Sequence, residues 1–216
     1  MDPVIDKDGF RIVPDVLSEN ECAELIRSLG STDGRAGTRH LMNNSEVRAV
    51  AHDPRLRTLA GGGIPFRATL FHKTGKANWL IPWHQDTALP LATKFDGEGW
   101  GPWSWKSSVW YAHAPESALK RVLALRLHLD SSTAQNGPLR VIPGSHHRLL
   151  TDAQVEELAA AASAFDCLSP CGGVIVMRPL LVHASSKIVN DLPRRVLHIE
   201  YVDSLVLGVG VELKVV

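Results

Sequence analysis

The sequence predicts a mainly β fold: a jelly-roll core (a cupin-like double-stranded β-helix) with flanking helices on its N-terminal side. Helical patterns fill the beginning of the chain, whereas short apolar runs bounded by turn residues dominate from residue 66 onward. Helices followed by many short strands are typical of an all-β core with helices packed outside it. A jelly roll folds such strands into two facing sheets. The 216 residues fit a single domain, 1–216.

Residues 1–65 are expected to support the core with helices. A short strand at 10–17 enters the first clear helix, whose start is marked by a capping box of Ser18 and Glu21. Gly30 ends the apolar stripe of this helix. The pair Asp53-Pro54 has the pattern of an N-cap followed by the first residue of a second helix.

Residues 66–216 are expected to form the jelly-roll core. The expected strands are 66–72, 79–86, 121–130, 139–142, 173–178, 180–183 and 195–203, with a helix at about 152–162 and an edge strand at 206–216. Between 121 and 130, leucines alternate strictly with Ala124, Arg126, His128 and Asp130. The leucines should face a core, and the other face is either solvated or lines a pocket.

The segment 87–117 is expected to be a long connection without regular structure. It holds four of the six tryptophans, which are Trp100, Trp103, Trp105 and Trp110. Connections longer than about 12–15 residues are often functional lids, and so many tryptophans argue against disorder. We predict a lid or substrate loop here, with an aromatic plug of the core as the alternative.

Composition excludes several classes of partner. Lys and Arg (23) balance Asp and Glu (23), without a basic block, so neither nucleic acid nor a membrane surface is indicated. No apolar run approaches the roughly 20 residues of a membrane span, and the first residues lack the pattern of a signal peptide. The cysteines Cys22, Cys167 and Cys171 are odd in number, which disfavours a disulfide framework. We therefore expect a cytoplasmic protein that acts on a small molecule.

His84, Asp86 and His183 form the pattern of a mononuclear metal site. Residues two apart on a strand share a face, so His84 and Asp86 should point into the same space while Gln85 points away. One further imidazole from a distant strand gives two histidines and one carboxylate on one side of a metal. This set suits Fe(II) in oxygenases because it leaves coordination positions open.

The chain holds three His-x-acid pairs, and about one is expected by chance in a sequence of this composition. The metal-binding pair must therefore be identified from its surroundings. The three are His84-x-Asp86, His128-x-Asp130 and His198-x-Glu200. The last has the pattern of ordinary strand alternation, whereas His128-x-Asp130 is a serious rival. The residues after His183 favour the first pair, because Ser185 and Arg194 follow it and an arginine fork suits a carboxylate. Arg195 should face the other way by strand alternation.

These motifs occur in an ordered series along the chain. The series is Lys73-Thr74-Gly75-Lys76-Ala77-Asn78-Trp79, Trp83-His84-Gln85-Asp86, 125–130, Asn136-Gly137-Pro138, Pro143-Gly144-Ser145-His146, Arg178 to Ser186 and Pro193 to Tyr201. With it, the chain resembles the phytanoyl-CoA dioxygenase family of Fe(II)/2-oxoglutarate oxygenases over essentially its whole length.

The resemblance implies roles for individual residues. His84, Asp86 and His183 would be the iron ligands, Arg194 would pair with the distal carboxylate of 2-oxoglutarate, and Ser185 would hydrogen-bond the same co-substrate. Arg126 and Lys73 are further candidates for binding the co-substrate, and Arg126 and His128 are possible walls of the pocket. Lys73, Asn78 and Arg39 are the weaker candidates.

The implied function is an Fe(II)- and 2-oxoglutarate-dependent dioxygenase. It would use O2 to hydroxylate a C–H bond of a small molecule and would release succinate and CO2. Asp86 favours hydroxylation, because related halogenases lack this carboxylate. A cupin-like isomerase or hydrolase with another metal, and a non-catalytic binding module, are the alternatives. Arg194 with Ser185 argues against the first, and the metal triad argues against the second.

Overall fold

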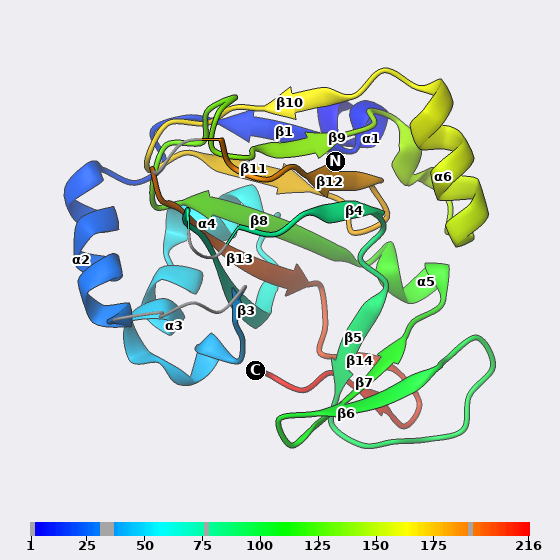
Figure 1. Cartoon of the computed structure of the whole chain (residues 1–216). Coiled ribbons are helices and arrows are strands. Elements are labelled where there is room, and N and C mark those ends of the chain that lie inside the picture. The colour runs from blue at the N-terminus through cyan, green and yellow to red at the C-terminus, as the bar shows by residue number, and fades with distance from the viewer. Residues whose placement is uncertain (1–2, 31–36, 76–77, 190–191) are drawn as a thin grey trace.

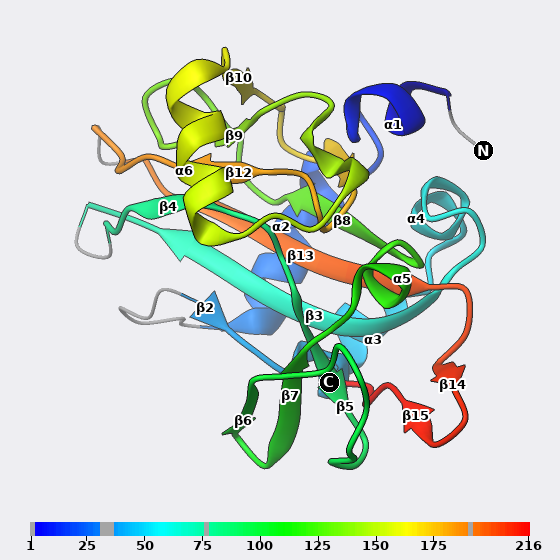
Figure 2. The same cartoon turned by 90° about the vertical axis from the view of Figure 1, so that its right-hand side faces the viewer.

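Two antiparallel sheets face each other in the computed structural model, which describes residues 3–30, 37–75, 78–189 and 192–216 (Figures 1 and 2). The larger, six-stranded sheet has the order β1-β11-β8-β13-β3-β2. Its strands are β1 (Phe10–Val13), β11 (Val174–Met177), β8 (Val122–His128), β13 (Arg194–Val202), β3 (Ile64–Lys73) and β2 (Gly37–Thr38). The smaller, four-stranded sheet is β10 (Phe165–Cys167), β9 (Leu139–Val141), β12 (His183–Ser185) and β4 (Ile81–His84). The expected jelly-roll fold is therefore confirmed.

Strand alternation gives the six-stranded sheet two different faces. The outer face packs against α2 (Glu19–Leu29), α3 (Ser45–Ala51) and α4 (Pro54–Leu59). Its apolar side chains on β8, β3 and β13 bury themselves among those of the helices, and they are Leu125, Leu127, Ala68, Leu70, Leu197, Ile199 and Tyr201. The intervening residues of the same strands point toward the smaller sheet. The leucines of 121–130 thus face the core, as expected.

The predicted helix starts are confirmed. Ser18 and Glu21 make a reciprocal capping box at the start of α2, and the Asp53 side chain accepts a hydrogen bond from the Arg55 backbone at the start of α4. Thr151 caps α6 (Asp152–Ala161) in the same reciprocal way. The remaining helical elements are short: α1 (Pro3–Asp8), α5 (Glu116–Leu119), and the 3-10 turns η1 (Leu41–Asn43) and η2 (Ser145–His147).

The structure departs from the expected elements at several places. Residues 180–182 form a turn, so β12 begins only at His183. The segment 206–216 forms a hairpin of β14 (Val206–Gly208) and β15 (Val211–Glu212) rather than one edge strand. The first 65 residues supply β1 and β2 to the edges of the six-stranded sheet in addition to helices.

The expectation that 87–117 lacks regular structure is wrong. A third sheet, β5 (Ala88–Leu91), β7 (Val109–His113) and β6 (Trp103–Lys106), occupies most of it, and Figure 2 shows this sheet below the jelly roll. Ser107 and Ser108 join β6 to β7 with φ of 47° and 63°. Such two-residue turns usually carry Asn or Gly, so two serines gave no hairpin signal.

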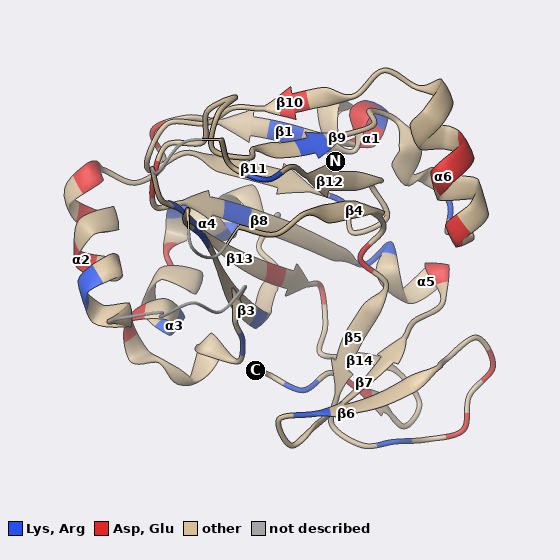
Figure 3. Ribbon diagram, in the orientation of Figure 1, with Lys and Arg blue, Asp and Glu red and all other residues tan. Residues whose placement is uncertain are grey.

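Charged residues of both signs are spread over the molecule (Figure 3). At its centre, Figure 3 also shows a basic position in β8 and an acidic position in β13. The three cysteines are free. Among the described residues, no helix combines the length and apolar character that a membrane span needs.

Candidate metal centre

The two sheets enclose a cavity of about 340 Å³, and the predicted metal ligands converge in its wall. Strand β12 pairs with β4 so that His183 lies directly opposite His84, with ring centroids 4.2 Å apart. Asp86 lies two residues beyond the end of β4, where its backbone N–H donates to the Pro179 carbonyl at 2.9 Å. One ligand atom from each of the three residues falls within 4.8 Å of the others.

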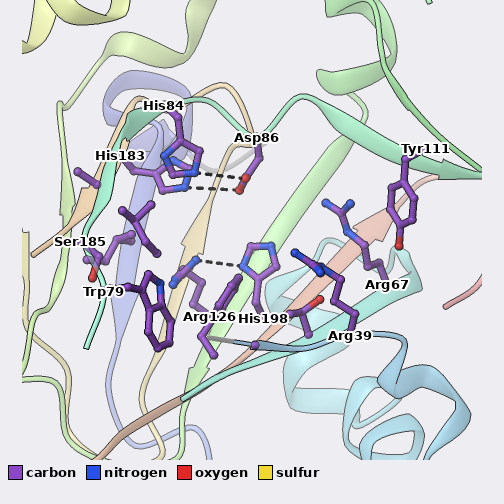
Figure 4. A pocket seen from close by; sticks show the side chains of 16 residues that line it. Arg39, Arg67, Trp79, His84, Asp86, Tyr111, Arg126, His183, Ser185 and His198 are labelled. Atoms are coloured by element: carbon purple, nitrogen blue, oxygen red, sulfur yellow. Dashed lines mark hydrogen bonds and ion pairs between the residues drawn. The ribbon is translucent and has the colours of Figure 1, made fainter. Parts of the chain in front are cut away.

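Backbone hydrogen bonds orient both imidazoles. Nδ1 of His84 lies 2.8 Å from the Pro82 carbonyl, and Nδ1 of His183 lies 2.8 Å from the Leu181 carbonyl. Because a carbonyl only accepts, each Nδ1 carries the proton and each Nε2 presents a lone pair. These Nε2 atoms face the Asp86 carboxylate at 3.7 and 3.5 Å (Figure 4).

Lone pairs and a carboxylate turned toward one another repel unless a cation lies between them. Such outer hydrogen bonds to metal-binding imidazoles are typical of metal sites. Burial lowers the pKa of His183 to about 3, so its ring is neutral and able to coordinate at pH 7. For Asp86, burial acts to raise the pKa, but the opposite effect of His183 and His84 is larger. The Asp86 pKa is therefore well below its usual value, and the carboxyl is ionised. The three residues therefore fit a ferrous ion.

Gln85 turns away from this site, as strand alternation predicts. Its side-chain amide nitrogen donates to the carbonyls of Arg148 and Leu180, and its oxygen accepts from the Leu150 backbone at 2.8 Å. The hydrogen bond to Leu180 thereby connects the segment after β4 with the turn that precedes His183.

Ser185 and Arg194 come together as predicted, at one end of the cavity. Arg194 is 1% exposed, and its Nη2 donates to the Ser185 hydroxyl at 3.2 Å. Its Nε donates to the Asn136 carbonyl, whereas its Nη1 has no partner among the described residues. Burial, reinforced by Arg126, lowers the Arg194 pKa to about 9. A buried guanidinium with a free donor suits an incoming carboxylate.

Lys73 joins the same group. Its Nζ donates to the Ser185 hydroxyl at 2.8 Å and to the Ser186 carbonyl at 2.6 Å. Burial and the nearby Arg194 and Arg126 lower its pKa to about 7. Ser185 lines the cavity, and Lys73 and Arg194 contact its hydroxyl; we call these three residues the basic end of the cavity.

The rival pair His128-x-Asp130 does not form a metal site. Asp130 accepts three hydrogen bonds from Arg195, two of them from the guanidinium at 2.7 Å. Arg195 therefore faces away from Arg194, as strand alternation predicts. His128 is fully buried, neither ring nitrogen has a partner among the described residues, and burial lowers its pKa to about 3. Asn78 is structural, since its amide pairs with the Ile188 backbone.

His198-x-Glu200 shows the ordinary strand alternation that the sequence predicts, within the regular strand β13. His198 lines the cavity, where its Nδ1 accepts from Arg126 at 3.3 Å. Glu200, 1% exposed, forms an ion pair with Arg67 on the neighbouring strand. The same period of two puts 194, 198 and 200 on one side of β13, and this signal could have found His198 and Glu200.

Other cavity residues had no sequence signal of their own. Tyr111 comes from β7, Thr69 and Phe71 from β3, and Trp79 from the chain before β4. Arg39 and Arg126, two of the weaker candidates, also line the cavity (Figure 4). The polar face of 121–130 thus contributes to the pocket at Arg126.

A family model described as phytanoyl-CoA dioxygenase (PhyH) matches residues 5–196. The chain belongs to the phytanoyl-CoA dioxygenase family. Membership and the His84–Asp86–His183 site confirm the prediction of an oxygenase that depends on iron, 2-oxoglutarate and O2. No curated protein matches the sequence.

Several solved structures share the fold of this chain. AviO1 from Streptomyces viridochromogenes Tue57 has a TM-score of 0.68 at 23% identity, covering 93% of this chain and 92% of that one. EctD from S. alaskensis with bound Fe has a TM-score of 0.66 at 22% identity, over 92% of this chain and 74% of that one. The epimerase SnoN, in complex with Fe3+, alpha ketoglutarate and nogalamycin RO, has a TM-score of 0.71 at 20% identity, over 94% and 82%.

Proposed function

We propose that this chain is a hydroxylase that inserts oxygen into a C–H bond of a small molecule while 2-oxoglutarate becomes succinate and CO2. The observation that carries the proposal is the complete site of His84, Asp86 and His183. A carboxylate among the ligands favours hydroxylation over halogenation, as the sequence comparison with the family implies. The proposed cytoplasmic location is supported by three free cysteines.

His84, Asp86 and His183 would hold the iron. When bound, iron with 2-oxoglutarate and O2 supplies the oxidising chemistry of the reaction. The two Nδ1–carbonyl hydrogen bonds keep the imidazoles in the tautomer that offers Nε2. The ionised Asp86 offsets part of the metal charge, so that open positions can accept the keto acid.

The basic end of the cavity would bind the distal carboxylate of 2-oxoglutarate. Arg194 has a free donor there, and the Ser185 hydroxyl lies between its guanidinium and the Lys73 ammonium. Arg126 is buried, forms no ion pair with a carboxylate in the described parts of the chain, and adds positive charge farther along the cavity. These cations would fix the orientation of the co-substrate by charge-assisted hydrogen bonds.

An anaerobic titration tests the proposal. Fe(II) is added to the purified protein, then 2-oxoglutarate, and the visible charge-transfer band of the chelate is recorded. We expect the band in the native protein and in a His52→Ala control, whose side chain is exposed outside the cavity, and not in His84→Ala. Absence of the band with tight binding of another metal would favour a cupin-like isomerase or hydrolase. Absence of metal binding would favour a non-catalytic binding module.

A further inference from the structure

The cavity has a second cationic end, opposite the basic end. Arg39, Arg67 and Tyr111 lie together there, on the far side of Arg126 and His198 from Ser185 (Figure 4). The two arginines differ in their partners. Arg67 is neutralised by its ion pair with Glu200 and also donates to the Ala88 carbonyl at 2.8 Å.

Arg39 has no such partner. Within the described parts of the chain, no carboxylate or hydrogen-bond acceptor engages its guanidinium, although the side chain lines the cavity. Thr38 pairs with Leu70, so the chain continues with Arg39 beside Thr69. The Thr69 residue is 8% exposed, lines the same cavity, and its hydroxyl has no partner among the described residues. Arg39, which is exposed, and the buried Thr69 thus lie on neighbouring strands and both line the cavity.

The register of the sheet extends this point into a polar row. Arg126 lies opposite His198, and His198 lies opposite Thr69, on three adjacent strands. Arg39 follows at the edge, and all four residues line the cavity. Because adjacent strands are roughly 4.8 Å apart, Arg39 lies roughly 14 Å across the sheet from Arg126. The backbone positions of the two arginines therefore lie at opposite ends of this row.

The charges around the cavity do not balance with the co-substrate alone. The cations are Arg39, Arg67, Arg126, Lys73 and Arg194, against the carboxylates of Asp86 and Glu200. The charges of Fe(II) and of the 2-oxoglutarate dianion cancel each other, which leaves about three positive charges, or about two if Lys73 is neutral. Excess positive charge in a partly enclosed cavity attracts anions.

We infer that the substrate to be oxidised is a small molecule with an oxyanion group, a carboxylate or a phosphate monoester, held by Arg39 and the Thr69 hydroxyl. This inference rests on the proposed function and names the substrate class of the same site. The planar fork of Arg39 matches either oxyanion bidentately. A cavity of about 340 Å³, shared with 2-oxoglutarate, admits only a compact body, and Phe71 and Tyr111 offer it apolar surface.

Matched pairs of acids and neutral analogues test the inference. The probes are acetate with acetamide, benzoate with benzamide, and phenyl phosphate with phenol. Dissociation constants come from the change in the charge-transfer band of the anaerobic Fe(II)–2-oxoglutarate complex and from thermal shifts of the protein with and without metal. At least one acid should bind tenfold more tightly than its neutral partner. The carboxylate and phosphate arms show which oxyanion is preferred.

Substitutions locate the preference. Arg39→Gln should weaken the preferred acid at least tenfold and change its neutral analogue less than twofold, and Arg39→Lys should retain part of the affinity. Arg48→Gln, on the exposed surface of α3, is the matched control and should keep the full preference. The inference is overturned if no acid exceeds its neutral partner, or if the preference survives Arg39→Gln. A missing band with an intact, Arg39-dependent acid preference would instead refute only the proposed function.

Discussion

Arg194 and Arg195 are neighbours on β13, but their side chains lie in different surroundings. Replacing Arg194 with glutamine should weaken the binding of 2-oxoglutarate, whereas replacing Arg195 should mainly lower the stability of the protein. Arg194 is 1% exposed and has no carboxylate partner among the described residues, whereas Arg195 is paired with Asp130 at 2.7 Å and is partly exposed. A hydrogen bond between charged groups contributes about 1.5–3 kcal/mol. If Arg194 binds the distal carboxylate of 2-oxoglutarate, Arg194→Gln should cost about 3 kcal/mol of binding free energy, or roughly a hundredfold in Kd.

For the free energy of unfolding, the order of the two substitutions should be reversed: Arg195→Gln should be the more destabilising one. Arg194→Gln removes a buried charge without a counter-ion, so the free energy of unfolding without co-substrate should be unchanged or higher. Arg195→Gln removes a partly exposed ion pair and should cost about 1 kcal/mol of stability, while the Kd for 2-oxoglutarate changes less than threefold. The assay is an anaerobic titration of the charge-transfer band, with urea unfolding alongside. An equal loss of affinity in both variants, or a loss only in Arg195→Gln, would refute the assignment of the clamp.

Further predictions concern the metal, pH and the third sheet. Asp86→Ala, like His84→Ala or His183→Ala, should reduce iron-dependent succinate formation about 100-fold or more, whereas His128→Leu should retain iron binding. Loss of iron binding in His128→Leu with iron binding retained in Asp86→Ala would identify His128-x-Asp130 as the metal-binding pair. Because the folded protein holds Lys73 with a pKa of about 7 against 10.5, the unfolded chain binds more protons between these values. Stability should therefore rise from pH 7 to pH 9 by about 2 kcal/mol more in the native protein than in Lys73→Met, measured by urea unfolding. Trp100→Ala with Trp103→Ala should lower stability by about 3 kcal/mol because both pack with Phe95 on the core; an unchanged melting temperature with a selective loss of substrate turnover would support the lid.

The sequence predicted those parts of the site that depend on strand alternation. His84 and Asp86 point to one site with Gln85 turned away, as the period of two predicts, although β4 ends at His84. Arg194 and Arg195 point in opposite directions because both belong to β13. The jelly-roll fold could be predicted because helical patterns at the start of the chain are followed by many short strands. The opposition of His84 and His183 across two paired strands required the tertiary structure.

The rest of the cavity had no local signal. Arg67 and Glu200 are 133 positions apart and meet only because β3 pairs with β13. Ser107 and Ser108 adopt the left-handed conformation of a hairpin turn without the usual Asn or Gly, so 87–117 had the pattern of an irregular connection. Arg39 enters the cavity through a two-residue edge strand, which is too short for a periodic pattern.

The division of the six-stranded sheet into two faces has a consequence for how this enzyme can change. On β13, residues 197, 199 and 201 pack against the helices, whereas 194, 198 and 200 belong to the cavity side. On β3, residues 68 and 70 face the helices while 67, 69 and 71 line the cavity. Evolution, or a laboratory library, can therefore vary cavity-side codons such as 69, 71 and 198 to select new substrates, while the interleaved codons preserve the folded scaffold.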